Sequence, residues 1–173
     1  MGSGGYVRCG ASRIASYFDT SGATSIVFFK VDFDQRQQFM PDYLPADYPG
    51  TFNVPIIGVG TGSVKVIRCT FINLYTTSIK MVAFDTLAVK WCTFESLLQT
   101  QTQVIDFITC TTGSIVTVNN NKFLGAATTS SDSVPCGMVL SGISVASTVK
   151  DNYFDYCGRN NVGTHRLGVI DFY

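Results

Sequence analysis

Charged residues and histidine are scarce in this chain. Only 14% of its 173 residues are charged, against roughly 25% in an average soluble domain. Twelve basic and twelve acidic residues cancel, so no field of one sign attracts nucleic acid or anionic lipid. His165 is the single histidine and no cysteine lies in a CxxC pair, which excludes an ordinary Cys/His zinc site. We therefore expect no nucleic-acid partner, no metal and no cofactor.

Long hydrophobic runs are also missing. No stretch of about eighteen consecutive apolar residues occurs, so the sequence predicts no membrane insertion. The opening MGSGGY has neither the basic patch nor the apolar run of a secretory signal. We expect residues 1–23 to be an N-terminal segment outside the main domain, left by cloning or by a cut inside a longer protein. We expect the six cysteines to be free thiols, because we expect the protein to be synthesised in a reducing cytoplasm.

A six-residue pattern recurs along the chain. Each copy consists of Val, two variable residues, Cys or Asn, one polar or aromatic residue, and Phe. The four copies are VIRCTF (66–71), VKWCTF (89–94), VNNNKF (118–123) and VKDNYF (149–154). Their starts lie 23, 29 and 31 residues apart, and a fainter copy, FFKVDF, covers 28–33. Repetition at this period is typical of a solenoid.

A second series of hydrophobic segments precedes the copies. Its members are PIIGV near Ile57, MVAF near Val82, VIDF near Ile105, MVL near Val139 and VIDF near Ile170. Thr, Val, Ile, Phe and Tyr dominate, and helical spacing is confined to the segment around 36–40. A β-sandwich offers no reason for one six-residue corner to recur. We therefore predict a parallel β-helix of about five coils over residues 24–173.

The pattern also predicts how each corner is built. In a regular strand, side chains an odd number of residues apart face opposite sides, and Val66 and Phe71 are five residues apart. A bend at residues 67–68 is therefore needed for Val66, Cys69 and Phe71 all to point inward. Asparagine at the cysteine position in later copies can hydrogen-bond from coil to coil. We expect Cys69, Cys92, Asn121 and Asn152 to lie above one another.

These V-x-x-N-x-F corners, clearest in VTVNNNKF and TVKDNYF, resemble the repeats of right-handed parallel β-helix proteins in the pectate-lyase-like superfamily. Low charge and abundant Ser, Thr and Gly make the chain most similar to the shaft of a bacteriophage tailspike. The resemblance covers residues 63–173 well and 24–33 faintly. It implies a fragment of a longer β-helix, in a homotrimer that binds, and often cleaves, a bacterial surface polysaccharide. Its expected location is the virion tail, or outside the cell after cytoplasmic synthesis.

Two other functions stay open. The chain can be a non-catalytic structural shaft or trimerisation module, or a fragment of a bacterial polysaccharide lyase or epimerase. Whether it is an enzyme is also open; if it is, we expect an endoglycosidase with paired carboxylates. The two carboxyl groups of such a pair lie about 5 Å apart in enzymes that retain the anomeric configuration, and roughly 6.5–9.5 Å apart in enzymes that invert it.

The best carboxylates in the expected register are Asp106, Asp171 and Asp85. Stacking the second series places one outward file through Gly58, Ala83, Asp106, Leu140 and Asp171. Asp106 and Asp171 would then lie two coils apart, and Asp85 on a diagonal to Asp106. The alternative is that all three are solvated residues on an exposed sheet.

Residues 35–55 depart from the solenoid pattern. Four of the five prolines fall there, so the segment is expected to be a loop excursion. Tyr43 and Tyr48, beside Asp42 and Asp47, suit a sugar, because rings stack on its CH faces while carboxylates bind hydroxyls. The loop can equally pack on its own solenoid or on a neighbouring subunit. Trp91 is expected to point outward from a corner, as a further sugar contact or as part of a subunit interface.

Overall fold

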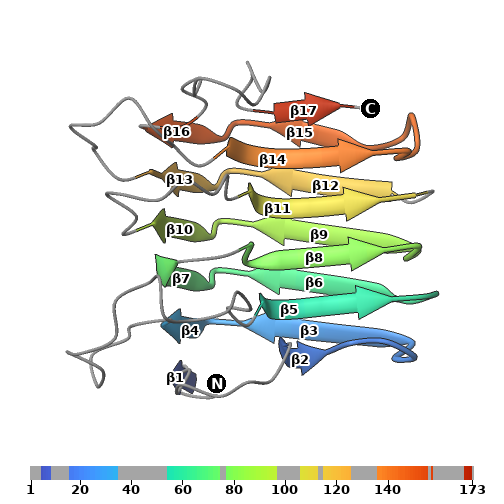
Figure 1. Ribbon diagram of the computed structural model, residues 1–173, viewed down its shortest axis with the longest axis horizontal. Helices are drawn as coiled ribbons and strands as arrows, with labels where there is room; N and C mark the ends of the chain where they lie inside the picture. Colours follow the sequence, from blue (N-terminus) through green and yellow to red (C-terminus); the bar gives the residue numbers. More distant parts are fainter. Residues whose placement is uncertain are drawn as a thin grey trace, which may run out of the picture.

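The computed structural model describes residues 5–8, 16–34, 54–74, 77–96, 106–112, 115–125, 136–155, 157 and 170–172. All the regular secondary structure among these residues is β-strand. The strands form three parallel sheets, which we name A, B and C, and they stack into a column (Figure 1). The predicted parallel β-helix is confirmed.

Sheet A holds the strands that follow the repeated corner. In spatial order they are β1 (Gly5–Arg8), β4 (Val31–Asp34), β7 (Thr70–Leu74), β10 (Thr93–Ser96), β13 (Lys122–Leu124) and β16 (Tyr153–Asp155).

Sheet B holds the second hydrophobic series. Its strands are β2 (Ser16–Asp19), β5 (Val54–Val59), β8 (Ile79–Val82), β11 (Asp106–Thr111), β14 (Cys136–Ser141) and β17 (Ile170–Phe172).

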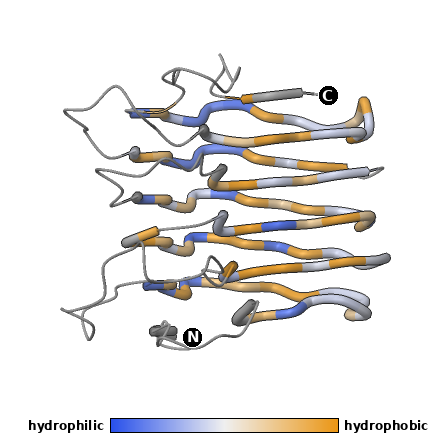
Figure 2. The backbone as a smooth tube through the Cα atoms, viewed as in Figure 1, coloured by the Kyte–Doolittle hydropathy of each residue, from blue (hydrophilic) through white to orange (hydrophobic). Residues whose placement is uncertain are grey.

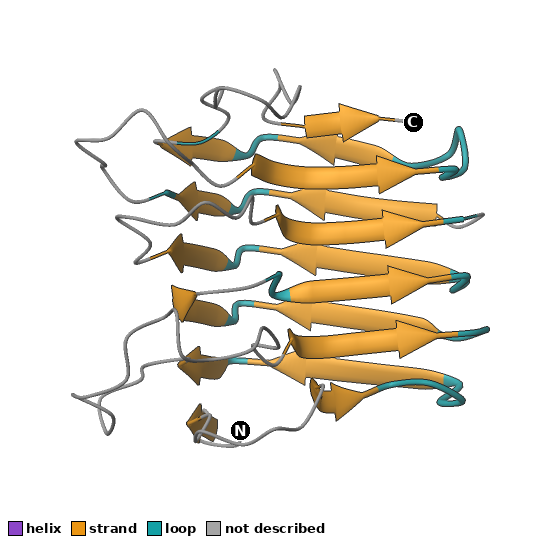
Figure 3. Ribbon diagram, in the orientation of Figure 1, coloured by secondary structure: helices purple, strands orange, loops and turns teal. Residues whose placement is uncertain are grey.

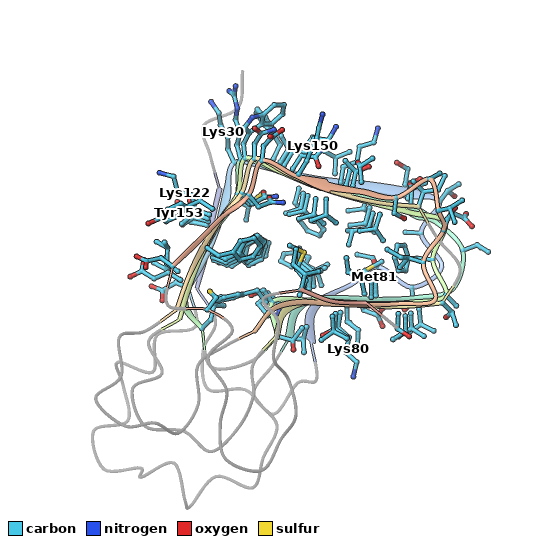
Figure 4. All side chains as sticks on the ribbon, turned by 90° about the horizontal axis from the view of Figure 1, so that it is seen from above. Lys30, Lys80, Met81, Lys122, Lys150 and Tyr153 are labelled. Carbon is cyan, nitrogen blue, oxygen red and sulfur yellow. The ribbon has the colours of Figure 1, made fainter. Side chains whose placement is uncertain are left out.

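Sheet C lies opposite sheet B across the core (Figure 4). Its strands are β3 (Ser25–Phe29), β6 (Ser63–Ile67), β9 (Thr86–Lys90), β12 (Ile115–Asn119) and β15 (Thr148–Lys150).

One coil runs through sheets B, C and A in that order. The coils β2–β3–β4, β5–β6–β7, β8–β9–β10, β11–β12–β13 and β14–β15–β16 give the predicted number of about five. Strands β1 and β2 belong to the solenoid although they precede residue 24, where we expected it to begin. Strand β5 likewise begins inside the expected loop excursion, at Val54, so that Pro55 lies in a strand.

Large apolar side chains fill the space between the sheets. The repeated phenylalanines of sheet A stack face to face, with ring centroids 4.7 Å apart between Phe71 and Phe94 and 4.9 Å apart between Phe94 and Phe123. This is the spacing of neighbouring strands. Val66, Val89 and Val118 form a second buried file. Figure 4, seen along the column, shows these files superimposed inside the coil, with Met81 also in the interior.

The described cysteines confirm the expectation of free, mostly buried thiols. Cys69, Cys92 and Cys110 are buried, Cys157 is partly buried, and none of the four forms a disulfide. Cys110 lies on β11 between Met81 and Leu140 of the neighbouring coils. Burial raises the pKa of the Cys110 thiol to about 12, from an ordinary value of 9.0.

The Cys110 thiol is expected to make stability fall at alkaline pH. Below pH 9 the thiol is protonated in both the native and the unfolded state; between pH 9 and 12 only the native state keeps the proton. In that window the thiol lowers the free energy of unfolding by about 1.4 kcal/mol per pH unit. Urea titrations across the window should show a shallower decline for Cys110→Val than for the wild type. All other groups are common to both proteins, so identical slopes would contradict the burial of this thiol.

Candidate functional site

Each coil passes from sheet C to sheet A through one residue in the left-handed conformation. Its φ is 52° at Lys30, 53° at Arg68, 54° at Trp91, 59° at Asn120 and 55° at Asp151. Residues other than glycine seldom adopt this conformation, and asparagine tolerates it best. The left-handed residue changes the alternation of the strand, so it faces outward while the next residue faces inward. Figure 3 shows the resulting corner repeating from coil to coil.

A hydrogen-bonded ladder behind the corner holds it in place. The Cys69 amide donates to the Cys92 Sγ (3.4 Å), the Cys92 amide to the Asn121 Oδ1 (2.8 Å), and the Asn121 amide to the Asn152 Oδ1 (3.0 Å). The Asn121 Nδ2 donates to the carbonyl of Val89, three residues before Cys92. This confirms the predicted file of Cys69, Cys92, Asn121 and Asn152. Because the ladder connects the second coil to the fifth, the outward side chains of these coils stand on a pre-ordered backbone.

The outward side chains of this corner form a continuous strip, which we name the corner ridge. It consists of the second, third and fifth residues of each six-residue copy, while the first, fourth and sixth face the core. The strand register places the second positions in one file and the fifth positions in another. The third positions lie between these files, and their amides donate hydrogen bonds to the following coil. Asn119 occupies a second position but is buried, and its Oδ1 accepts a hydrogen bond from the Lys150 amide at 3.2 Å. The three files are Phe29, Ile67, Lys90, Asn119 and Lys150; Lys30, Arg68, Trp91, Asn120 and Asp151; and Asp32, Thr70, Thr93, Lys122 and Tyr153.

Three aromatic side chains lie exposed on the corner ridge. Phe29 is 52% exposed, Trp91 54% and Tyr153 56%, which confirms that Trp91 points outward. They occupy the first, third and fifth coils, one in each file, so they follow a diagonal across the ridge. Successive rings are two coils apart, about 10 Å along the axis. The Arg68 guanidinium lies 5.9 Å from the centroid of the Trp91 ring, and the Lys30 Nζ 5.5 Å from that of Phe29.

The corner ridge is also basic. Every coil contributes one positive side chain to it: Lys30, Arg68, Lys90, Lys122 and Lys150. Asp32 and Asp151 are its two acids, which leaves a net charge of +3 from five bases and two acids. Figure 2 shows hydrophilic residues stacked at this corner. In Figure 4, Lys30 and Lys150 project from the corner and Lys122 and Tyr153 from the adjoining face, while Lys80 projects from the opposite side.

The predicted carboxylate file is wrong in register. Asp106 pairs with Cys136 and not with Leu140, whereas Asp171 pairs with Val139. Asp171 is therefore displaced from Asp106 by three residues along the strand direction and by two coils along the axis. This places their backbones roughly 14 Å apart. The true files of sheet B run through Ile56, Ile79, Ile108, Met138 and Ile170, and through Gly58, Met81, Cys110, Leu140 and Phe172.

Asp85 is not diagonal to Asp106 either. Ile108 pairs with Ile79, so Asp106 is level with the residue two positions before Ile79. Asp85 lies beyond the other end of β8, in the turn to β9, and is exposed. From the position level with Asp106 to the last residue of β8, Val82, the backbone extends over about 17 Å. The backbone register therefore separates all three predicted carboxylates from one another, and their catalytic role stays a prediction.

The four loop residues predicted to contact substrate, Asp42, Tyr43, Asp47 and Tyr48, lie outside the described residues. Of the predicted sugar contacts, only Trp91 is placed, at the middle of the corner ridge. The other ridge residues were not predicted, because neither the net charge nor the pattern of core positions reveals them. They could have been found by comparing the second, third and fifth residues of the six-residue copies, which are the outward positions.

Within the described part of the chain, no group of three or more His, Cys, Asp or Glu residues is placed to hold a metal ion. No helix found there has the length and apolar character needed to cross a membrane. Comparison with protein-family models, with curated proteins and with solved structures gives no match for this chain.

Proposed function

We propose that this chain is a polysaccharide-binding β-helix segment of a viral tailspike or a similar receptor-binding adhesin, and that the glycan lies along the corner ridge. The observation that carries the proposal is the diagonal of exposed Phe29, Trp91 and Tyr153. Aromatic faces pack against the CH faces of sugar rings. A spacing of about 10 Å is close to the length of a disaccharide unit in an extended glycan.

Polar groups suited to sugar hydroxyls surround the aromatic rings. Asn120 is exposed in the coil after Trp91, and Thr93 and Thr70 occupy the adjoining file. The backbone beneath them is fixed by coil-to-coil hydrogen bonds, such as Trp91 N to Asn119 O at 3.3 Å and Arg68 N to Lys90 O at 3.0 Å. A pre-ordered site loses little conformational entropy on binding. The proposed activity is glycan binding alone. The register of Asp85, Asp106 and Asp171 gives no support for hydrolysis by these three residues.

Trp91 gives a direct test, because it is the single tryptophan of the chain. A panel of purified bacterial capsular polysaccharides and O-antigens would be screened by intrinsic fluorescence and by calorimetry. A glycan that binds the ridge should change the Trp91 emission and protect the ring from acrylamide quenching. Trp91→Asn should lower the affinity about tenfold. Asparagine keeps the left-handed backbone, as Asn120 does in the next coil.

The matched control is Val59→Asn, at an exposed apolar side chain on sheet B, away from the ridge. It should leave the affinity unchanged. If a bound glycan neither alters the Trp91 emission nor responds to Trp91→Asn, the ridge is not the binding site. If no glycan of the panel binds, the function itself is wrong.

The second candidate function is a structural shaft or trimerisation module. Exposed apolar side chains favour it: Val27 (55% exposed) lies on sheet C beside the ridge and Val59 (51% exposed) on sheet B. In this alternative the ridge aromatics contact a neighbouring subunit. The same panel decides between the two functions, since a shaft binds none of the glycans.

A further inference from the structure

We infer that the ligand of the corner ridge is an acidic polysaccharide, with carboxylate or phosphate groups on successive units, and not a neutral one. This inference rests on the proposed function and adds the chemical class of the glycan. It comes from the distribution of charge on the folded chain, which the net charge of zero conceals.

The positive side chains follow the axis of the solenoid at a regular interval. Each of the five coils brings one base to the ridge, so the charges rise by about 4.8 Å per coil. The stacked phenylalanine rings give the same rise, between 4.6 and 4.9 Å from Phe33 to Phe154. An extended acidic glycan presents its negative groups at comparable intervals, one for each sugar or each disaccharide. A polymer lying along the ridge can therefore meet a base at every step.

The ridge bases are available to a ligand. Lys30, Arg68, Lys122 and Lys150 are exposed, and Lys90 is partly buried beside Trp91. Within the part of the chain that the structure describes, none of the five forms an ion pair. The contacts of Lys30 and Arg68 with Phe29 and Trp91 hold cations against the aromatic rings on which sugars would stack.

The flanks of the ridge limit where the acidic ligand can lie. On sheet A the next outward file carries Glu95 and Asp155, which repel a polyanion. On sheet C the next outward file carries Val27 and Lys65, which do not. The ligand is therefore expected to keep to the corner ridge and to the adjoining edge of sheet C, and not to extend onto the file of Glu95 and Asp155.

The test uses an oligomannuronate long enough to span the five coils and the same oligomer with its carboxylates reduced to neutral alcohols. Both are titrated into the protein by calorimetry and by Trp91 fluorescence. The acidic oligomer should bind at least tenfold more tightly, and its affinity should fall as salt is added, because the ridge charges are exposed.

Two charge reversals in the same coil form the matched pair. Lys90→Glu lies on the ridge, and Lys80→Glu lies on sheet B at the opposite side of the solenoid. Each changes the net charge by the same amount. Lys90→Glu should weaken binding of the oligomannuronate about tenfold, while Lys80→Glu should change it less than about twofold. An equal effect of the two variants would show that only net charge matters and would overturn the inference.

The remaining outcomes separate this inference from the proposed function. If the acidic and the neutral oligomer bind the ridge equally well, the charge argument is wrong and the polysaccharide function stands. If neither oligomer binds, and no glycan of the bacterial panel binds, both are wrong. If a single-stranded oligothymidylate of equal charge binds more tightly than the oligomannuronate, the acidic partner is a nucleic acid and the inference is overturned.

Discussion

Replacing Phe94 with alanine is expected to destabilise the chain by about 3–5 kcal/mol. The Phe94 side chain is fully buried, between the parallel rings of Phe71 and Phe123. It also contacts the tilted ring of Phe107, at a centroid distance of 6.0 Å. Its loss leaves a cavity in the middle of the column and interrupts the stack that joins the lower coils to the upper ones.

Urea unfolding followed by circular dichroism measures this effect. Phe29→Ala is the control, because Phe29 is another phenylalanine of the repeat but projects outward. It should change the free energy of unfolding by less than about 0.5 kcal/mol. Equal losses in the two variants would show that the phenylalanine file is not the core.

Replacing Asn121 with alanine is expected to lower the free energy of unfolding by about 2–6 kcal/mol. Asn121 is buried, its Oδ1 accepts from the Cys92 amide, and its Nδ2 donates to the Val89 carbonyl and to the Asn152 Oδ1. Alanine leaves the Cys92 amide and the Val89 carbonyl buried without these partners. Each unsatisfied group costs about 1–3 kcal/mol.

The chain supplies its own conservative variant for this position. In the preceding coil Cys92 takes the same place: its Sγ accepts from the Cys69 amide and donates to the Val66 carbonyl. Asn121→Cys should therefore recover a substantial part of the stability that Asn121→Ala loses, in the same urea titration. A cysteine variant no more stable than the alanine variant would show that the ladder stabilises by packing alone.

The corner was predictable from the sequence because it is local and free of insertions. Six residues fix the inward positions of Val66, Cys69 and Phe71, and the same spacing recurs in each coil. Buried polar groups must be satisfied, so asparagine at an inward position already implies a hydrogen-bonded partner in the next coil. Both expectations are confirmed by the positions of Asn121 and Asn152.

The register of sheet B was not predictable in the same way. Two VIDF segments, at 104–107 and 169–172, look equivalent, but Ile170 and Phe172 are level with Ile108 and Cys110. The connections that lead into β11 and β17 differ in length, so sequence likeness alone cannot align these strands. Near the start of β11 the successive residues Phe107 and Ile108 are both buried, which breaks the alternation used to place Asp106.

The corner ridge shows a different limit. A net charge of zero predicts no attraction for a polyanion, yet the fold gathers five of the chain's twelve bases along one corner with only two acids. Composition averages over the whole surface, whereas a ligand meets one strip of it. Only the register, which brings one base from each coil into the strip, reveals the local charge.

The most direct test of the in-register solenoid is a methyl–methyl NOE spectrum of protein with labelled valine methyl groups. Val66, Val89, Val118 and Val149 are paired in consecutive coils. Cross-peaks should join Val66 to Val89, Val89 to Val118, and Val118 to Val149, with none between Val66 and Val118. Cross-peaks that skip a coil, or the absence of all three contacts, would contradict the solenoid and the ridge that depends on it.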